Sequence, residues 1–197
     1  RVARKFKVEY ACVPRHPRGM FNRFFPFLAA LALGSAALAQ QVQLLPDDKV
    51  SAQIAEIDVG VICAQEIVGF NDAPGTIAGT TNVIEGEPEF ISRARVVPAV
   101  MGVGFGVKSR SANPFGLDGV VMTVTHPPMG ADGATQQVYS TAIRGTARSI
   151  TFYQFDYNYE LLVGRWEMEA SLNGEVLYRV GFDVVPPTAV PELAGAC

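Results

Sequence analysis

The chain has 197 residues, of which 49% are hydrophobic and 18% are charged, and its formal net charge is −3. This length allows one folded domain with room for a tail. Seven of the sixteen basic residues but only one of the nineteen acidic residues lie in residues 1–39, so the remainder carries a net charge of −9. Because no basic stripe remains, nucleic acids and anionic lipid surfaces are excluded as main partners.

Residues 20–39, MFNRFFPFLAALALGSAALA, have the pattern of a secretory signal peptide. Arg23 supplies the positive charge, residues 24–33 form the apolar segment, and Ala-Leu-Ala at 37–39 is a typical cleavage signature. The apolar run of about 15 residues is shorter than the roughly 20 that span a bilayer. We therefore expect cleavage before Gln40 and a periplasmic or secreted product, with no membrane span after cleavage.

Residues 1–19 begin with Arg1 and are strongly basic. We expect them to lie upstream of the true start at Met20, outside the mature protein; a long basic leader is the alternative. After the leader, residues 40–51 are polar and are predicted to be a flexible lead-in.

Removal of residues 1–39 would change the number of cysteines. Cys12 is lost, and the two that remain are Cys63 and Cys197. Because thiols usually pair in an oxidising compartment, we predict a disulfide between them. Closing a loop of about 134 residues would stabilise the fold by on the order of 4–5 kcal/mol. The alternative is a buried Cys63 and a free Cys197.

From residue 52 onward the chain shows strand patterns at roughly ten-residue spacing. Alternating or β-branched runs occur at 55–63, 90–97, 101–107, 120–125, 137–143, 149–155 and 164–185. Residues 69–88 have no sustained period and are predicted to be a long loop, with room for a short strand at 82–85. With about seven strands and no helical stretch, residues 52–186 are predicted to form an all-β, antiparallel sandwich, followed by an extended surface tail at 187–197.

Residues 164–185 carry the strongest pattern, because apolar and polar residues alternate on both sides of Asn173-Gly174. A two-residue turn there would place the apolar side chains of one strand opposite polar ones. We therefore predict a three-residue loop at 172–174, with Gly174 in the left-handed conformation as a G1 bulge. The resulting register pairs Ala170 with Val176, Met168 with Tyr178 and Trp166 with Val180, and it buries Trp166 in the core.

The strand at 101–107, MGVGFGV, presents Gly102, Gly104 and Gly106 on one face. Glycine weakens a strand, so three on one face need a reason. One interpretation is a surface that a ligand or another backbone approaches closely. The favoured interpretation is a bulky neighbour, such as an aromatic ring of an adjacent strand, lying across them.

Three stretches resemble an exported bacterial family of unknown function. They are HPPM at 126–129, YELLVGRW at 159–166 and LNGEVLYRVGFDVV at 172–185. The resemblance covers roughly residues 52–185 and implies a periplasmic domain with an immunoglobulin-like (Ig-like) β-sandwich. It brings no catalytic residues. In such a sandwich, Tyr157 or Tyr159 would be placed to form a tyrosine corner.

His126 is the single histidine after residue 39, and no nucleophile motif accompanies it. It is therefore expected to end a strand before Pro127-Pro128 and to hydrogen-bond a loop carbonyl, with a catalytic base as the alternative. One histidine and two cysteines are too few for a zinc site, so no metal or cofactor is predicted.

Carboxylates occur in two groups. Glu85, Glu87 and Glu89 are predicted to form a solvated acidic loop, with calcium binding as the alternative. Asp156 and Glu160 could cleave glycosides at a suitable separation, but Glu160 is expected instead to bind backbone amides at a strand end. No phosphate loop or dinucleotide fingerprint is present in the sequence.

The leading functional prediction is a non-enzymatic Ig-like module that binds an unknown protein or envelope component. Its contact surface would be exposed edge strands together with Gly102, Gly104, Gly106 and His126. The alternatives are a carboxylate-based hydrolase acting on an envelope polymer and a carrier with an apolar pocket between the sheets.

Overall fold

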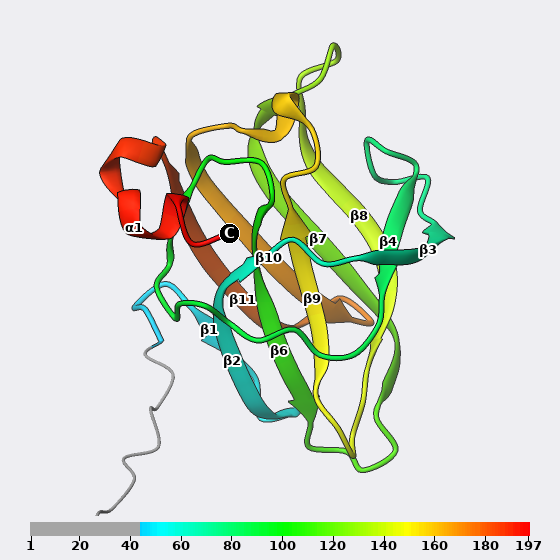
Figure 1. Cartoon of the computed structure of the whole chain (residues 1–197). Helices are drawn as coiled ribbons and strands as arrows, with labels where there is room; N and C mark the ends of the chain where they lie inside the picture. Colours follow the sequence, from blue (N-terminus) through cyan, green and yellow to red (C-terminus); the bar gives the residue numbers. More distant parts are fainter. Residues whose placement is uncertain (1–43) are drawn as a thin grey trace, which may run out of the picture. The chain divides into compact units, whose positions relative to one another are not determined.

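The structure, a computed structural model, describes residues 44–197 (Figure 1). The predicted signal peptide and the upstream residues 1–19 therefore lie outside the described residues. The described chain forms the strands β1 Lys49–Val50, β2 Ile54–Cys63, β3 Ile67–Asp72, β4 Thr80–Ile84, β5 Val96–Pro98, β6 Val103–Ser111, β7 Leu117–Met129, β8 Ala134–Ile143, β9 Ser149–Gln154, β10 Gly164–Leu172 and β11 Glu175–Val185. It also forms 3-10 turns at Asn158–Glu160 and Pro187–Ala189 and the short helix α1, Pro191–Ala194.

Two sheets face each other. The larger, six-stranded sheet has the order β1-β11-β10-β7-β8, with β5 pairing to β11, and the smaller has the order β2-β6-β9. All pairings within them are antiparallel except that of β5 with β11. Strands β3 and β4 pair only with each other. The predicted all-β antiparallel sandwich is confirmed.

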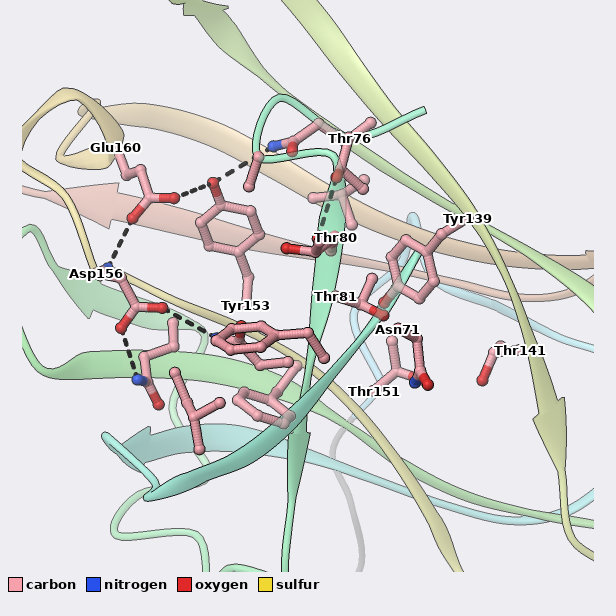
Figure 2. A pocket seen from close by; sticks show the side chains of 18 of the residues that line it. Asn71, Thr76, Thr80, Thr81, Tyr139, Thr141, Thr151, Tyr153, Asp156 and Glu160 are labelled. Atoms are coloured by element: carbon pink, nitrogen blue, oxygen red, sulfur yellow. Dashed lines mark hydrogen bonds between the residues drawn. The ribbon is translucent and has the colours of Figure 1, made fainter. Parts of the chain in front are cut away.

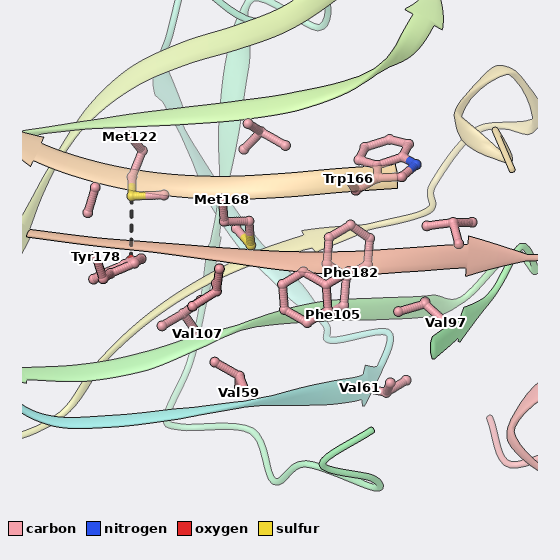
Figure 3. Packing of buried hydrophobic residues seen from close by; sticks show 14 of the residues in the cluster. Val59, Val61, Val97, Phe105, Val107, Met122, Trp166, Met168, Tyr178 and Phe182 are labelled. Atoms are coloured by element: carbon pink, nitrogen blue, oxygen red, sulfur yellow. Dashed lines mark hydrogen bonds between the residues drawn. The ribbon is translucent and has the colours of Figure 1, made fainter. Parts of the chain in front are cut away.

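The core lies between the facing sheets (Figure 3). The ring of Phe105 on β6 lies 4.7 Å from that of Phe182 on β11 and 5.6 Å from that of Trp166 on β10. All three side chains are fully buried. The indole Nε1 of Trp166 donates to the backbone oxygen of Leu162 at 2.9 Å, so burial leaves this polar atom bonded. The predicted core position of Trp166 is confirmed.

The β10–β11 hairpin has the predicted strands but a different turn. Asn173 and Gly174 both have positive φ, 52° and 84°, as a two-residue type I′ turn requires. The three-residue loop and its pairing are therefore wrong. The register shifts at Ala170, so that the observed pairs are Ala170 with Tyr178, Met168 with Val180 and Trp166 with Phe182. The two-residue turn alone would place the apolar side chains of the two strands on opposite faces. An extra residue, the β-bulge at Leu177, brings them back to one face.

Strand β7 runs through the prolines that were predicted to stop it. It continues past Thr125 to Met129, across His126-Pro127-Pro128. The register with β8 shifts between Thr125 and Met129, and the pairing with β10 ends at Thr125. The prolines therefore lie where regular pairing has lapsed and their missing N–H groups cost little.

Residues 69–88 are not a long loop. They contain most of the β3–β4 hairpin, a separate two-stranded sheet. The lead-in also differs from prediction, because β1 pairs with β11 and the carboxylate of Asp48 meets Arg95 at 2.7 Å. The Asp48 side chain is 0% exposed, so the chain is fixed from this residue onward.

The tail is folded rather than extended, since it forms a 3-10 turn and α1. The predicted disulfide between Cys63 and Cys197 is present, with 5.2 Å between the Cα atoms. It holds the end of the tail against the end of β2, close to the start of β3.

The glycine face of β6 is covered. Gly104 and Gly106 are buried, and a Cβ added to Gly106 would lie 2.7 Å from the Cβ of Phe152 on β9. The interpretation that a bulky neighbour on an adjacent strand lies against these glycines holds, with the aromatic Phe152 at Gly106 and with Ile62 of β2 at Gly104. Gly102 lies outside the strand, in a turn with φ of 81°. The three glycines therefore do not form a free contact surface.

Candidate functional site

A cleft of about 470 Å³ lies between the β3–β4 hairpin and strands β8 and β9, which are edge strands of the two facing sheets (Figure 2). Its lining comes from the hairpin, from β7, β8 and β9, and from the turn after β9. The lining residues are Ile67, Phe70, Asn71, Thr76, Ala78, Thr80, Thr81, Asn82, Val124, Gln137, Tyr139, Ser140, Thr141, Ile150, Thr151, Phe152, Tyr153, Gln154, Asp156, Tyr157 and Glu160.

The tip of the β3–β4 hairpin is fastened to β8. The backbone N–H of Val138 donates to the oxygen of Gly75 at 2.9 Å. The N–H of Ile77 donates to Oε1 of Gln137 at 3.0 Å. A Cβ on Gly75 would lie 2.3 Å from the backbone oxygen of Val138, so this close approach requires glycine. The hairpin therefore spans the opening between the two sheet edges.

The turn after β9 closes one end of the cleft. Glu160 accepts from the hydroxyl of Tyr153 at 2.9 Å through Oε1, and its Oε2 accepts from the N–H groups of Asp156 and Tyr157 at 2.7 and 2.8 Å. The prediction that Glu160 binds backbone amides is confirmed. Burial raises the pKa of Glu160, and these three donors oppose that effect by stabilising the carboxylate.

Asp156 is held in a similar way. Its Oδ1 accepts from Nε2 of Gln154 at 2.7 Å, and its Oδ2 accepts from Nδ2 of Asn82 at 3.1 Å. The bond from Asn82, a β4 residue, fastens the hairpin at this end of the cleft as well. Both carboxylates that the sequence singled out thus lie in one cleft, and each is bonded by protein donors.

His126 lies behind the cleft and is 3% exposed. Its Nδ1 is 2.8 Å from the oxygen of Pro127, and its Nε2 is 3.3 Å from Nε2 of Gln137. The predicted hydrogen bond to a backbone carbonyl is present, but the carbonyl belongs to Pro127 within β7 and not to a loop. The side chain is buried and is not part of a contact surface. Burial lowers the pKa of His126, which keeps the ring neutral near pH 7.

Two aromatic rings stand exposed beside the cleft. Tyr157 and Tyr159 are 54% and 42% exposed, and their rings stack 5.3 Å apart with 7° between their planes. Neither forms the buried tyrosine corner expected from the sequence. Tyr157 lines the cleft, and its ring stacks on that of Tyr159, which supports it from one side.

The acidic run at 85–89 lies elsewhere and is partly engaged. Glu87 forms ion pairs with Lys108 at 3.0 Å and with Arg148 at 2.6 Å, so the run is not simply a solvated loop. In residues 44–197 no group of three or more His, Cys, Asp or Glu side chains is placed to hold a metal ion.

The described residues thus form an antiparallel β-sandwich with a polar and aromatic cleft along one side. A family model described as a domain of unknown function (DUF3859) matches residues 50–184, and the chain belongs to this family. The match agrees with the resemblance drawn from the motifs at 126–129, 159–166 and 172–185.

Among solved structures, an immunoglobulin-like protein from Pseudomonas aeruginosa is similar, with 17% sequence identity and a TM-score of 0.46. The similarity covers 71% of this chain and 97% of that chain. A search of the curated proteins found no match. Within residues 44–197, no helix is long and apolar enough to cross a membrane.

Most of the cleft was missed by the sequence analysis. It found Asp156 and Glu160 but not Gln137, Tyr153 or the hairpin residues. One usable signal was Gln137 itself, because it shares the inward-facing positions of β8 with Tyr139 and Ile143. A glutamine among apolar residues of one strand face must find hydrogen-bond partners inside the protein.

Proposed function

We propose that this protein is a non-catalytic binding module that holds an uncharged, hydroxyl-rich ligand, a saccharide chain, in the cleft beneath the β3–β4 hairpin. The observation that carries the proposal is the composition of the cleft. Its lining combines hydroxyl, amide, aromatic and aliphatic side chains with the carboxylates of Asp156 and Glu160, which protein donors already bond, and within the described residues no lysine or arginine contributes to it. Anionic ligands such as phosphates are therefore disfavoured.

The lining matches the chemistry of a sugar chain. Asn71 offers an amide donor and acceptor, Asn82 and Gln154 each keep one amide hydrogen beyond the one bonded to Asp156, and the threonines of β4 offer hydroxyls. The faces of sugar rings are apolar, and the exposed ring of Tyr157, held by its stack on Tyr159, is suited to pack against them. A cleft with a few polar groups among aromatic ones is the usual form of a small-ligand site.

The absence of catalysis is part of the proposal. Glycoside hydrolysis by two carboxylates needs one protonated acid facing the leaving oxygen and a second carboxylate free to act as nucleophile or base. Glu160 instead uses both oxygens to bind Tyr153 and two backbone N–H groups, and both oxygens of Asp156 accept from side-chain amides. These bonds support roles in holding the turn and the hairpin.

Export to the periplasm completes the proposal, and its support is the signal-peptide pattern at 20–39 together with the disulfide. An exported saccharide-binding module would meet the glycan chains of the cell envelope. This narrows the predicted envelope component to a polysaccharide.

The test uses the single tryptophan of the chain as a reporter. Trp166 lies 4.9 Å, ring to ring, from the cleft residue Tyr153. We expect its fluorescence to change on titration with at least one of three neutral tetrasaccharides: cellotetraose, maltotetraose or the β-1,4-linked tetramer of N-acetylglucosamine. Chromatography after overnight incubation should recover the sugar intact.

Two variants locate the site. Tyr157→Ala should weaken binding about tenfold through lost stacking, which corresponds to about 1.4 kcal/mol. Phe115→Ala is the matched control, because Phe115 is 94% exposed and does not line the cleft. No saturable response with any tetrasaccharide, a stronger response to tetralysine or to a sulfated sugar, or cleavage of the bound sugar would contradict the proposal.

A further inference from the structure

A series of hydrogen bonds joins His126 to the tip of the β3–β4 hairpin through one buried side chain, Gln137. The amide of Gln137 faces three groups: the N–H of Ile77 at 3.0 Å, Nε2 of His126 at 3.3 Å and the hydroxyl of Tyr153 at 3.3 Å. Gln137 and His126 are both buried. The amide therefore has little choice of partners other than these.

Two backbone groups determine which atoms carry the hydrogens along this series of hydrogen bonds. The N–H of Ile77 can only donate, so Oε1 of Gln137 faces it, and the two hydrogens of Nε2 face His126 and Tyr153. The oxygen of Pro127 can only accept, so Nδ1 of His126 carries the hydrogen. It follows that Nε2 of His126 carries no hydrogen and accepts from Gln137, and that the hydroxyl of Tyr153 donates a hydrogen bond to Glu160.

Protonation of His126 would break this order. Its Nε2 would then carry a hydrogen that points at the hydrogen of Gln137 Nε2 across 3.3 Å. The conflict is relieved if the amide turns over, so that Oε1 accepts from the imidazolium. The NH₂ group would then face the N–H of Ile77, and two donors cannot bond each other. Ile77 would lose its acceptor on β8.

We propose that Gln137 is a latch for the β3–β4 hairpin, and that protonation of His126 turns the latch and releases the hairpin tip from β8. The remaining bond at the tip joins Val138 to Gly75. Its loss together with that of Ile77 would open the cleft from the β8 side. The consequence for ligand binding rests on the function proposed above, whereas the movement of the hairpin does not.

The groups around His126 set the pH at which the latch turns. Tyr153 of β9 faces it through Gln137, and Glu160 lies behind Tyr153. From β10 it faces Trp166, which does not titrate, with ring centres 5.0 Å apart. Burial lowers the pKa of His126 below its ordinary value near 6.5, and the hydrogen bond to the oxygen of Pro127 opposes that effect in part. The latch is thus closed at neutral pH and opens in mild acid. Protonation of His126 favours opening, because the imidazolium is less desolvated once the hairpin has moved away.

The test measures hydrogen exchange of the Ile77 amide by NMR from pH 7.5 to pH 5, expressed as protection relative to the free peptide rate and without ligand. We expect protection of Ile77 to fall at least tenfold as the imidazole signals of His126 titrate. The amide of Met168 in β10 is the internal control and should keep its protection.

Two variants separate a latch from general loosening. Gln137→Glu offers two acceptor oxygens, so it can bind Ile77 and a protonated His126 together, and Ile77 should stay protected at pH 5. His126→Phe keeps a ring but cannot titrate, so protection of Ile77 should not depend on pH. Unchanged protection in the wild type to pH 5, a His126 that does not titrate in the folded protein, or a Gln137→Glu variant that opens like the wild type would overturn the latch. Saccharide titration at pH 7.5 tests the proposed function separately, because the latch is closed there.

Discussion

The two β-hairpins of this protein, β10–β11 and β3–β4, have opposite places in the structure. Hairpin β10–β11 lies inside the larger sheet, pairs with β7 on one side and β1 on the other, and contributes Trp166 and Phe182 to the core. Hairpin β3–β4 pairs with no other strand, and most residues of β3 are exposed. Phe70, at 66% exposure, faces the cleft and solvent instead of the core.

Because of this difference, we expect global stability and access to the cleft to depend on different hairpins. Segments with much buried apolar surface open only with the whole fold, whereas segments held by a few edge contacts open alone. We therefore expect β10–β11 to determine the free energy of unfolding and β3–β4 to determine access to the cleft. The following experiments can confirm or break this separation.

The largest effect is expected for Trp166→Ala in β10. Removing a fully buried indole leaves a cavity among Phe105, Phe155 and Phe182, which should lower the free energy of unfolding by about 3–5 kcal/mol. Urea denaturation followed by circular dichroism measures it, since the variant has no tryptophan. Phe70→Ala is the matched aromatic control and should change the free energy by less than about 0.5 kcal/mol. Equal losses in the two variants would contradict the separation.

A similarly large effect is expected for the double variant Cys63→Ser, Cys197→Ser. The bridge closes a sequence separation of 134 residues, and its removal should cost about 4–5 kcal/mol. The loss should appear equally when the wild type is unfolded in the presence of a reducing agent. If the variant and the wild type unfold at the same urea concentration, the bridge contributes nothing to the fold.

The smallest effect on the global free energy of unfolding is expected for Gly75→Ala, which should have a large effect on the hairpin tip. The new methyl group would lie 2.3 Å from the backbone oxygen of Val138, so the hairpin tip must leave β8. Global stability should fall by no more than about 1 kcal/mol, while the Ile77 amide loses protection and saccharide binding weakens. Gly69→Ala is the control within the same hairpin, because its methyl group would meet only Val83 at an ordinary 3.8 Å. Similar exchange in both variants would show that the tip is not anchored at Gly75.

The same contrast explains what could be predicted from the sequence. Strands β10 and β11 face the core on one side, so burial imposes the alternation that predicts them. Their turn was mispredicted because a bulge at Leu177 leaves no mark in the sequence pattern. Strands β3 and β4 face no core, so they carry no sustained alternation. The sequence predicts a long loop there with room for a short strand at 82–85, which overlaps β4, and it does not predict β3.

The cleft could be predicted only in part for a related reason. Its residues come from the hairpin, β7, β8, β9 and the turn after β9, and only the fold brings Asn82 beside Asp156 or Gln137 beside His126. The role of Glu160 was predicted because it is local, with backbone partners three and four residues away. Long-range polar contacts of this kind have no sequence period.

The covered glycines also limit how this protein can meet others. Gly60 on β2 lies under Phe90, and Lys108 on β6 lies under the same ring and pairs with Glu87. The chain's own segment around Phe90 therefore serves as a third layer on the outside of the smaller sheet. Another protein therefore cannot pack against the outer face of the smaller sheet at this point. Contacts with other molecules are left to the edges of the sheets, where the cleft opens.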